Sequence, residues 1–178
     1  MADGNMRSAE PGPIVVRLTE DAWPVLRGAR LAALADAPAA FAITLAEARA
    51  YDGERWRKTL RTGATFVALL DRAPVGMVAA IPRLHRDECG LGAMWVDPAW
   101  RGRGVADRLA AEVVAWARSE GKRRIDLWAP ADDPRARRFY QRQGFVPTGL
   151  TRPFPGTPGR RIAEMLLGLP AVHDPDQA

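Results

Sequence analysis

The chain has 178 residues, of which 47% are hydrophobic and 26% charged, a composition typical of one globular domain with its own core. No apolar run reaches membrane-spanning length and the N-terminus lacks a hydrophobic signal core, so we expect a cytoplasmic protein without a membrane partner. The single cysteine, Cys89, excludes an internal disulfide, and with only two histidines, His85 and His173, we expect no metal site.

The N-terminal half predicts helices placed between a first strand and a hairpin. Thr19 precedes a helical pattern and can cap it, and Thr44 with Glu47 forms the pattern of a capping box. The expected elements are a flexible tail at 1–13, a strand at 14–18, a helix at 20–35, a helix at 45–63 broken at Asp52-Gly53, and strands at 64–70 and 75–81.

The C-terminal half predicts a strand, a helix and a second strand that form a right-handed parallel unit. Asp133-Pro134 is typical of a helix start, because a capping residue precedes a first-turn proline. The expected elements are a strand at 89–96, a helix ending at Glu120, a strand at 125–129, a helix ending at Gly144, strands at 145–151 and 161–169, and a flexible tail at 170–178.

The junction of the parallel unit has the pattern of an anion-binding site. A strand ends at Val96, a proline turn follows, and Gly102 and Gly104 lead directly into the helical pattern. The unpaired N–H groups at a helix start carry the positive end of the helix dipole, and glycines let an anion approach them closely. Arg101 and Arg103 add positive charge. These residues predict a diphosphate site, and the alternative is an ordinary strand-to-helix turn whose glycines relieve strain.

Two common phosphate-binding motifs do not fit this junction. It lacks the Gly-Lys-Ser/Thr ending of a P-loop. It also lacks a full Gly-x-Gly-x-x-Gly motif with an acidic residue near the end of the next strand, because Asp126 lies inside that strand pattern.

Three motifs together resemble the GNAT N-acetyltransferase superfamily over about residues 14–169. The segment Arg101-Gly102-Arg103-Gly104-Val105-Ala106 is similar to the family's pyrophosphate loop, and Val96-Asp97-Pro98 to the end of the strand before it. Ala136, Phe139-Tyr140 and Gly144-Phe145 fit the later helix-and-strand motif. Asp133 stands where many members have Asn; since an ionised carboxylate only accepts hydrogen bonds, we expect it to cap the helix.

The resemblance implies a mixed α/β domain at 14–169, with a mostly antiparallel sheet of about seven strands that splays between parallel strands four and five and is flanked by four helices. It implies acetyl-CoA as cosubstrate, and a homodimer is one expectation because members often pair. The implied cofactor-binding residues are Met94, Trp95, Val96, Arg101, Gly102, Arg103, Gly104, Val105, Ala106, Asp133 and Ala136.

The implied reaction moves the acetyl group directly to a primary amine of a small molecule or peptide, through a tetrahedral intermediate. Tyr140 is the expected acid for the thiolate. Glu88 is the first candidate for the base, with Glu47, Asp87 and His85 as others.

The family's acceptor side would involve the apolar residues Phe41, Trp56 and Phe154, which also fit an ordinary core. Two further readings are a non-catalytic acyl-CoA sensor and an arginine-rich nucleic-acid module. The net charge of +5 argues little for the latter, because the arginines are spread through every segment.

Overall fold

The computed structural model describes residues 12–155 and 157–170. Its single sheet has seven strands in the order β1-β2-β3-β4-β5-β7-β6. The strands are β1 (Ile14–Arg17), β2 (Ala64–Leu70), β3 (Ala73–Pro82), β4 (Glu88–Val96), β5 (Arg124–Pro130), β6 (Val146–Pro153) and β7 (Arg161–Gly168). The α-helices are α1 (Trp23–Asp36), α2 (Leu45–Ala50), α3 (Gly53–Thr62), α4 (Val105–Ser119) and α5 (Pro134–Arg142), with 3-10 turns η1 (Glu20–Ala22), η2 (Pro38–Ala40) and η3 (Pro98–Trp100).

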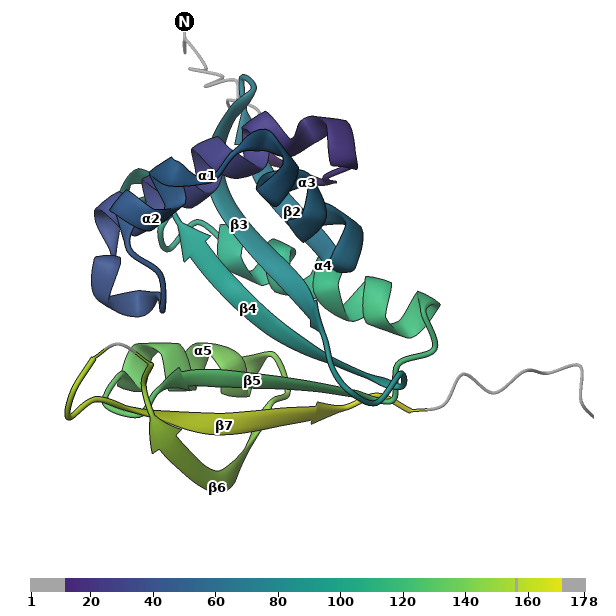
Figure 1. Cartoon of the computed structure of the whole chain (residues 1–178). Helices are drawn as coiled ribbons and strands as arrows, with labels where there is room; N and C mark the ends of the chain where they lie inside the picture. The colour runs from purple at the N-terminus through teal and green to yellow at the C-terminus, as the bar shows by residue number, and fades with distance from the viewer. Residues whose placement is uncertain (1–11, 156, 171–178) are drawn as a thin grey trace, which may run out of the picture.

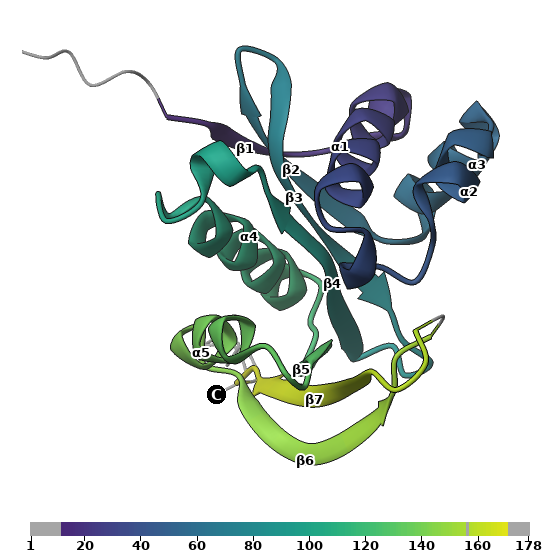
Figure 2. The same cartoon turned by 90° about the vertical axis from the view of Figure 1, so that its left-hand side faces the viewer.

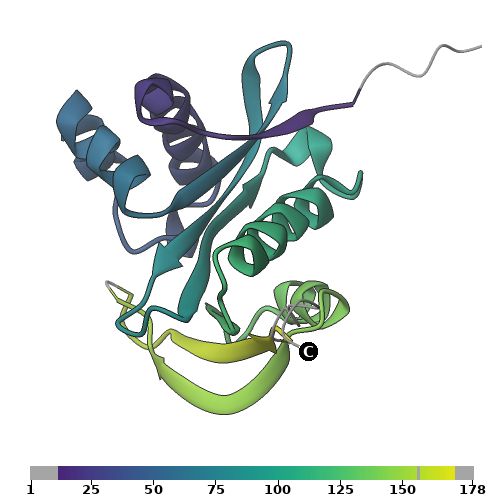
Figure 3. The same ribbon diagram turned by 90° about the vertical axis from the view of Figure 1, so that its right-hand side faces the viewer.

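The sheet separates two helical layers, as Figures 2 and 3 show from opposite sides. Helices α4 and α5 cover one face, where a core forms around Leu109, Val113, Ile125, Leu127 and Phe145. Helices α1, α2 and α3 cover the β1–β4 part of the other face, where Leu26, Leu34, Trp56, Val67 and Met77 are buried. In the part of the chain that the structure describes, no helix is long and apolar enough to cross a membrane.

The predicted mixed sheet and its parallel β4–β5 pair are confirmed, but the described residues hold five α-helices where four were expected. The segment expected as one broken helix forms two, because α2 ends at Ala50 and the backbone at Tyr51 and Asp52 is extended. Asp52 then starts α3 by accepting a hydrogen bond from the Arg55 amide at 2.8 Å.

The capping predictions differ in outcome. The capping box is confirmed, since the Glu47 amide donates to Thr44 Oγ1 at 3.1 Å and the Thr44 amide donates to Glu47 Oε2 at 2.7 Å. The prediction for Thr19 is wrong: its side chain makes no capping bond, and it precedes the turn η1. Helix α1 begins only at Trp23, with Pro24 in the first turn, where a missing N–H costs nothing.

The predicted tails, 1–13 and 170–178, lie outside the described residues except at 12, 13 and 170. Pro13 is fully buried, and its carbonyl accepts a hydrogen bond from Arg108 at 2.8 Å. The folded domain therefore includes at least one residue before the predicted boundary.

The parallel strands β4 and β5 pair over only part of their length. Their ladder runs from Glu88 opposite Arg124 to Leu91 opposite Leu127, and beyond this point β4 pairs with β3 and β5 with β7. Figure 1 shows the two halves of the sheet meeting at the start of these strands and diverging toward their carboxyl ends. The splay that the resemblance implied is therefore present, and it opens beside the start of α4.

Candidate active site

A cavity of about 590 Å³ occupies the divergence between β4 and β5. One wall comes from β4, the turn after it and the first turn of α4, and the other from β5 and α5. The lining residues are Ala40, Leu91, Gly92, Ala93, Met94, Val96, Trp100, Arg101, Gly102, Gly104, Val105, Ala106, Asp107, Trp128, Ala129, Pro130, Asp133, Arg135, Ala136, Phe139, Tyr140 and Arg142. Ten of the predicted site residues thus lie together around one cavity.

The predicted anion loop presents free backbone amides to this cavity. Gly102 and Gly104 both have φ of +75°, a conformation that favours glycine, and a side chain added at either would meet open space. The first backbone hydrogen bond of α4 is donated by the Arg108 amide to the Gly104 carbonyl, at 3.2 Å. Among the described residues, the amides from Gly102 to Asp107 find no hydrogen-bond acceptor. An anion of suitable size would supply the acceptors that they lack.

Arg101 is held by the protein rather than turned toward a ligand. Its Nε donates to the Val96 carbonyl at 3.0 Å, and its guanidinium forms an ion pair with Asp36 at the end of α1. The same carboxylate oxygen of Asp36 accepts a hydrogen bond from the Trp95 indole at 2.9 Å. Asp36 therefore connects α1 to both the loop and β4, a role that no local sequence pattern signals because its partners lie 59 and 65 residues away.

Trp95 is the one predicted contact on β4 that the structure does not bring to the cavity. Its side chain is 5% exposed and packs in the core beneath α1, on the face of the sheet opposite α4. Because side chains alternate along a strand, a position between Met94 and Val96 points away from the side that they share.

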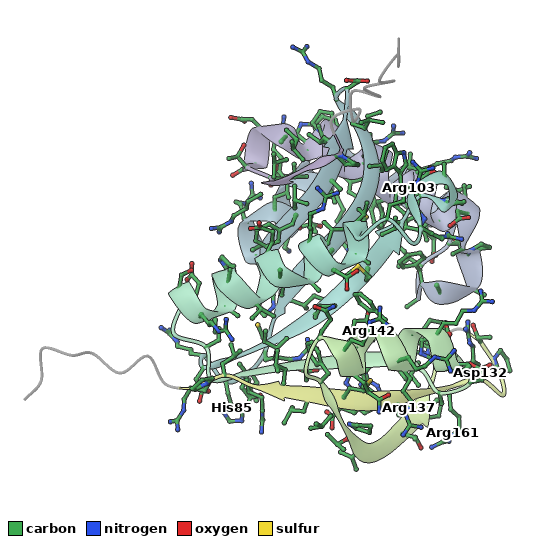
Figure 4. All side chains as sticks on the ribbon, turned by 180° about the vertical axis from the view of Figure 1, so that it is seen from behind. His85, Arg103, Asp132, Arg137, Arg142 and Arg161 are labelled. Carbon is green, nitrogen blue, oxygen red and sulfur yellow. The ribbon has the colours of Figure 1, made fainter. Side chains whose placement is uncertain are left out.

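Two arginines near the start of α4 and the end of α5 lie on aromatic rings that line the cavity. The Arg103 guanidinium is 5.0 Å from the centre of the Trp100 ring, and that of Arg142 is 5.8 Å from the centre of the Phe139 ring. In Figure 4 Arg103 lies near the start of α4 and Arg142 between α4 and α5. They give this end of the cavity positive charge that no ion pair neutralises within the described residues.

Tyr140 lines the cavity from α5 and is 9% exposed. Its ring packs edge-on against Phe139 and Phe145, with centroid distances of 4.9 and 5.8 Å. Burial, and then the nearby charge of Asp133, raise the pKa of the Tyr140 phenol above its usual range. The phenol therefore keeps its proton and can donate a hydrogen bond into the cavity.

Asp133 caps α5, as the sequence predicts. Its Oδ1 accepts hydrogen bonds from the amides of Arg135 at 2.9 Å and Ala136 at 3.1 Å. These bonds fix the first turn of α5 at the cavity wall and so set the position of Tyr140 two turns later.

A β-bulge shapes the β4 wall of the cavity. The β3–β4 ladder passes from the pair Ala79–Gly92 to the pair Met77–Trp95, so Ala93 and Met94 both lie opposite Val78. Ala93 has a φ of +54°, which is uncommon for a residue other than glycine. Such a bulge interrupts the ladder, leaves the extra residue unpaired and bends the strand, here beside the gap between β4 and β5.

None of the four candidate bases lines the cavity. Glu88 lies where β4 begins, at the closed end of the splay, and forms an ion pair with Arg124. Asp87 and His85 belong to the turn before it, and Figure 4 shows His85 at the opposite end of the sheet from Arg103. Glu47 is engaged in the capping box, whose hydrogen bonds from Thr44 lower the pKa of its carboxyl.

The predicted acceptor residues are not gathered at the cavity. Trp56 is 3% exposed, belongs to the core under α1 and does not line the cavity. Phe41 follows Ala40, a lining residue, and stacks under Arg30 at 4.5 Å. Phe154 stacks under Arg160 at 5.6 Å, and Arg160 donates to the Ala39 carbonyl. Phe41 and Phe154 thus flank the cavity rather than form its wall.

Cys89 is buried in the core between β3 and β5, and burial raises the pKa of its thiol to about 11. A neutral buried thiol is a packing group, in agreement with its position in the strand pattern. In residues 12–155 and 157–170, no group of three or more His, Cys, Asp or Glu side chains is arranged to hold a metal ion.

Sequence comparison finds two relatives that share part of this chain. An N-acetyltransferase of Methanocaldococcus jannaschii, itself uncharacterized, is 30% identical over 96 residues, which cover 51% of this chain and 42% of that protein. The mycothiol acetyltransferase of Beutenbergia cavernae is 28% identical over 134 residues, which cover 74% of this chain and again 42% of that protein. The chain thus spans less than half the length of these curated relatives.

Solved structures share the fold over most of the chain. An acetyltransferase of the GNAT family from Streptococcus pneumoniae has a TM-score of 0.76 at 18% identity, covering 89% of this chain and 99% of the other. A putative acetyltransferase structure from Salmonella typhimurium, solved with its cofactor acetyl-CoA, has a TM-score of 0.72 at 17% identity. The match covers 94% of this chain and 100% of the other. The model of the acetyltransferase (GNAT) family matches residues 31–145, and the chain is a member of this family.

Proposed function

We propose that this protein transfers the acetyl group of acetyl-CoA directly to a primary amine of a small molecule or peptide. The observation that carries the proposal is the row of unpaired amides from Gly102 to Asp107 at one end of a cavity that also contains Tyr140. Family membership supports acetyl transfer, and the bound acetyl-CoA of the Salmonella typhimurium structure supports this cosubstrate.

The loop amides would bind the diphosphate of coenzyme A. Gly102 and Gly104 leave the approach to these amides open, and the helix dipole of α4 favours an anion there. Arg103 and Arg142 add attraction for the phosphates from the rim, while Arg101 stays paired with Asp36 and fixes the shape of the loop. This division assigns binding to the backbone and positioning to Arg101.

The pantetheine arm would lie in the gap between β4 and β5, against Met94, Val96 and Ala136. The bulge at Ala93 and Met94 interrupts the β3–β4 ladder beside this gap. An amide there would polarise the thioester carbonyl and stabilise the oxyanion of the tetrahedral intermediate. Together with positioning of the two reactants, this stabilisation accounts for most of the rate.

Tyr140 would protonate the departing thiolate of coenzyme A, or donate a hydrogen bond to it. Its raised pKa keeps the phenol neutral at every ordinary assay pH. We therefore expect no loss of kcat on the alkaline side below about pH 10, the ordinary pKa of tyrosine.

The amine proton would pass to water in the cavity, because none of the candidate bases is brought to the cavity wall. A primary amine with a pKa of about 10.4 is mostly protonated at neutral pH. We therefore expect kcat/KM to rise about tenfold per pH unit up to the pKa of the acceptor, without an earlier plateau set by a carboxylate.

The test combines calorimetry with acetyl-CoA and a thiol-release assay over a panel of amines. We expect saturable binding of acetyl-CoA and release of coenzyme A that depends on the amine. Binding without release for any amine would instead support the acyl-CoA sensor. Absence of binding would overturn the proposed function.

A further inference from the structure

Three arginine–aromatic pairs involve rings that line the cavity. Two of them, Arg103 on Trp100 and Arg142 on Phe139, belong to the end where the phosphates of coenzyme A would lie. The third places the Arg152 guanidinium 4.0 Å from the centre of the Trp128 ring. This is the shortest distance between a guanidinium and an aromatic ring among the described residues. The pair belongs to β5 and β6, away from the anion loop.

Strand register places Arg152 and Trp128 on one face of the sheet. Arg152 is opposite Ile162, Ile162 is opposite Pro130, and Pro130 is two residues from Trp128. Ala129, between them, points to the other face and is buried in the core with Tyr140. Arg152 therefore lies on the face away from α5 and reaches across β7 to the Trp128 ring, which lines the cavity, while Arg152 itself is exposed and is not one of the lining residues.

The guanidinium of Arg152 has no carboxylate within 4 Å in the described parts of the chain. Glu164, opposite Trp128 on β7, accepts its hydrogen bond from Thr148 instead. Asp132 lies 3.9 Å from Arg160. Stacking on the ring orients the planar group but leaves its five N–H donors free for a ligand.

Several residues that line the cavity together with Trp128 are small or apolar, among them Ala40, Gly92, Ala93 and Pro130. The positive charge of Arg152 on the Trp128 ring is available to an anionic group of the acceptor. An acceptor that carries a carboxylate would gain a bidentate ion pair with Arg152.

We propose that Arg152, held on Trp128, binds a carboxylate of the acceptor, so that the acceptor is an amino acid or a similar amine with an acidic group. This inference rests on the proposed acetyl transfer and adds the chemical class of the acceptor. Apolar residues that line the cavity, among them Trp128 and Pro130, favour an uncharged side chain on that acceptor.

The test uses matched acceptors that differ only in the carboxylate. Thiol release is measured with methionine and phenylalanine, with their amides, and with phenethylamine. For the wild type we expect kcat/KM for the acids to exceed that for the amides by at least about tenfold. In Arg152→Gln we expect this preference to disappear through a higher KM for the acids, with the acetyl-CoA affinity and the amide rates unchanged. Arg152→Lys should keep part of the preference.

Arg161→Gln is the matched control. Arg161 lies on the same hairpin, donates to Thr151, and belongs to the opposite face of β7 from Ile162. It should keep the full preference for the acids. The inference is overturned if acids and amides react equally in the wild type, if Arg152→Gln slows both alike, or if only amines without a carboxylate react. If acetyl-CoA itself does not bind, the proposed function falls, and the inference falls with it.

Discussion

The loop from Gly102 to Asp107 offers backbone amides to the cavity, whereas the opposite end offers side chains from three separate segments. Ala40 follows α1 and Trp128 belongs to β5, both of which line the cavity, and Arg152 of β6 stacks on the Trp128 ring. The loop is a continuous stretch of chain whose geometry is set by two glycines of positive φ. The other end exists only after η2, β5 and the β6–β7 hairpin have come together.

This difference explains which end of the cavity can be predicted from the sequence. Every residue except proline has a backbone amide, so an anion site made of amides requires no particular side chains. Its signal in the sequence is the local pattern of strand, turn and spaced glycines. A site made of side chains from distant elements has no local pattern. The predictions that follow test whether the two ends divide in this way.

The largest effect is expected from Tyr140→Phe, which removes the proposed acid and keeps the ring. We expect kcat to fall about 100-fold, the usual contribution of a positioned acid, with the acetyl-CoA affinity unchanged within about twofold. Steady-state kinetics and calorimetry measure the two quantities. Tyr51→Phe, at the other tyrosine of the chain, should change neither. A variant with full turnover would remove the acid role.

Gly104→Ala tests directly the end of the cavity that the backbone amides form. We expect acetyl-CoA to bind at least about tenfold more weakly, because an L-residue at this φ costs about 1–2 kcal/mol and its Cβ enters the space before the amides. Gly121→Ala is the matched control, since Gly121 lies just beyond the other end of α4 with φ of +67° and open space around it. The two variants should lose similar unfolding free energy, and only the first should lose affinity. Equal affinities would mean that the loop does not hold the diphosphate.

Much of the fold followed from sequence because periodicity, caps and glycines act locally. The bounds of β2, the capping box at Thr44 and the cap at Asp133 are examples. The separation of α2 from α3 was visible at Asp52-Gly53, but whether a break divides a helix depends on where each half packs. Trp56 shows the same limit, since a helix presents a buried aromatic and a ligand-binding one with the same spacing.

Glu88 illustrates why the distance of a candidate base from the cavity could not be found from sequence. Its place at the start of β4 was predicted correctly, but the length of the β4–β5 ladder decides which end of the strand faces the cavity. That length depends on pairing between strands separated by a whole helix. Asp36 could not be found for a related reason, because its partners Trp95 and Arg101 come from a distant part of the chain.

Asp36→Asn tests whether binding of acetyl-CoA by the loop amides depends on a side chain that is remote in the sequence. The variant keeps the shape of the residue but removes the charge that pairs with Arg101. We expect acetyl-CoA to bind about threefold more weakly, because a partly exposed ion pair contributes about 1 kcal/mol or less to fixing the loop. Asp21→Asn, on η1, controls for the change in net charge. Tighter binding would contradict the comparison, since it would mean that a freed Arg101 side chain, and not the amides, dominates the anion site.

The smallest effect is expected from Glu88→Gln, which removes the carboxylate that the sequence favoured as base. Glu88 lies at the closed end of the splay and pairs with Arg124, so we expect kcat to change less than about twofold and the unfolding free energy by about 1 kcal/mol or less. The pH dependence of kcat/KM should keep its slope, because in the proposed mechanism the proton passes to water in the cavity and not to this side chain. A large loss of kcat with a new inflection in the pH profile would show that a group outside the cavity wall controls proton transfer. Glu88 would then be the base.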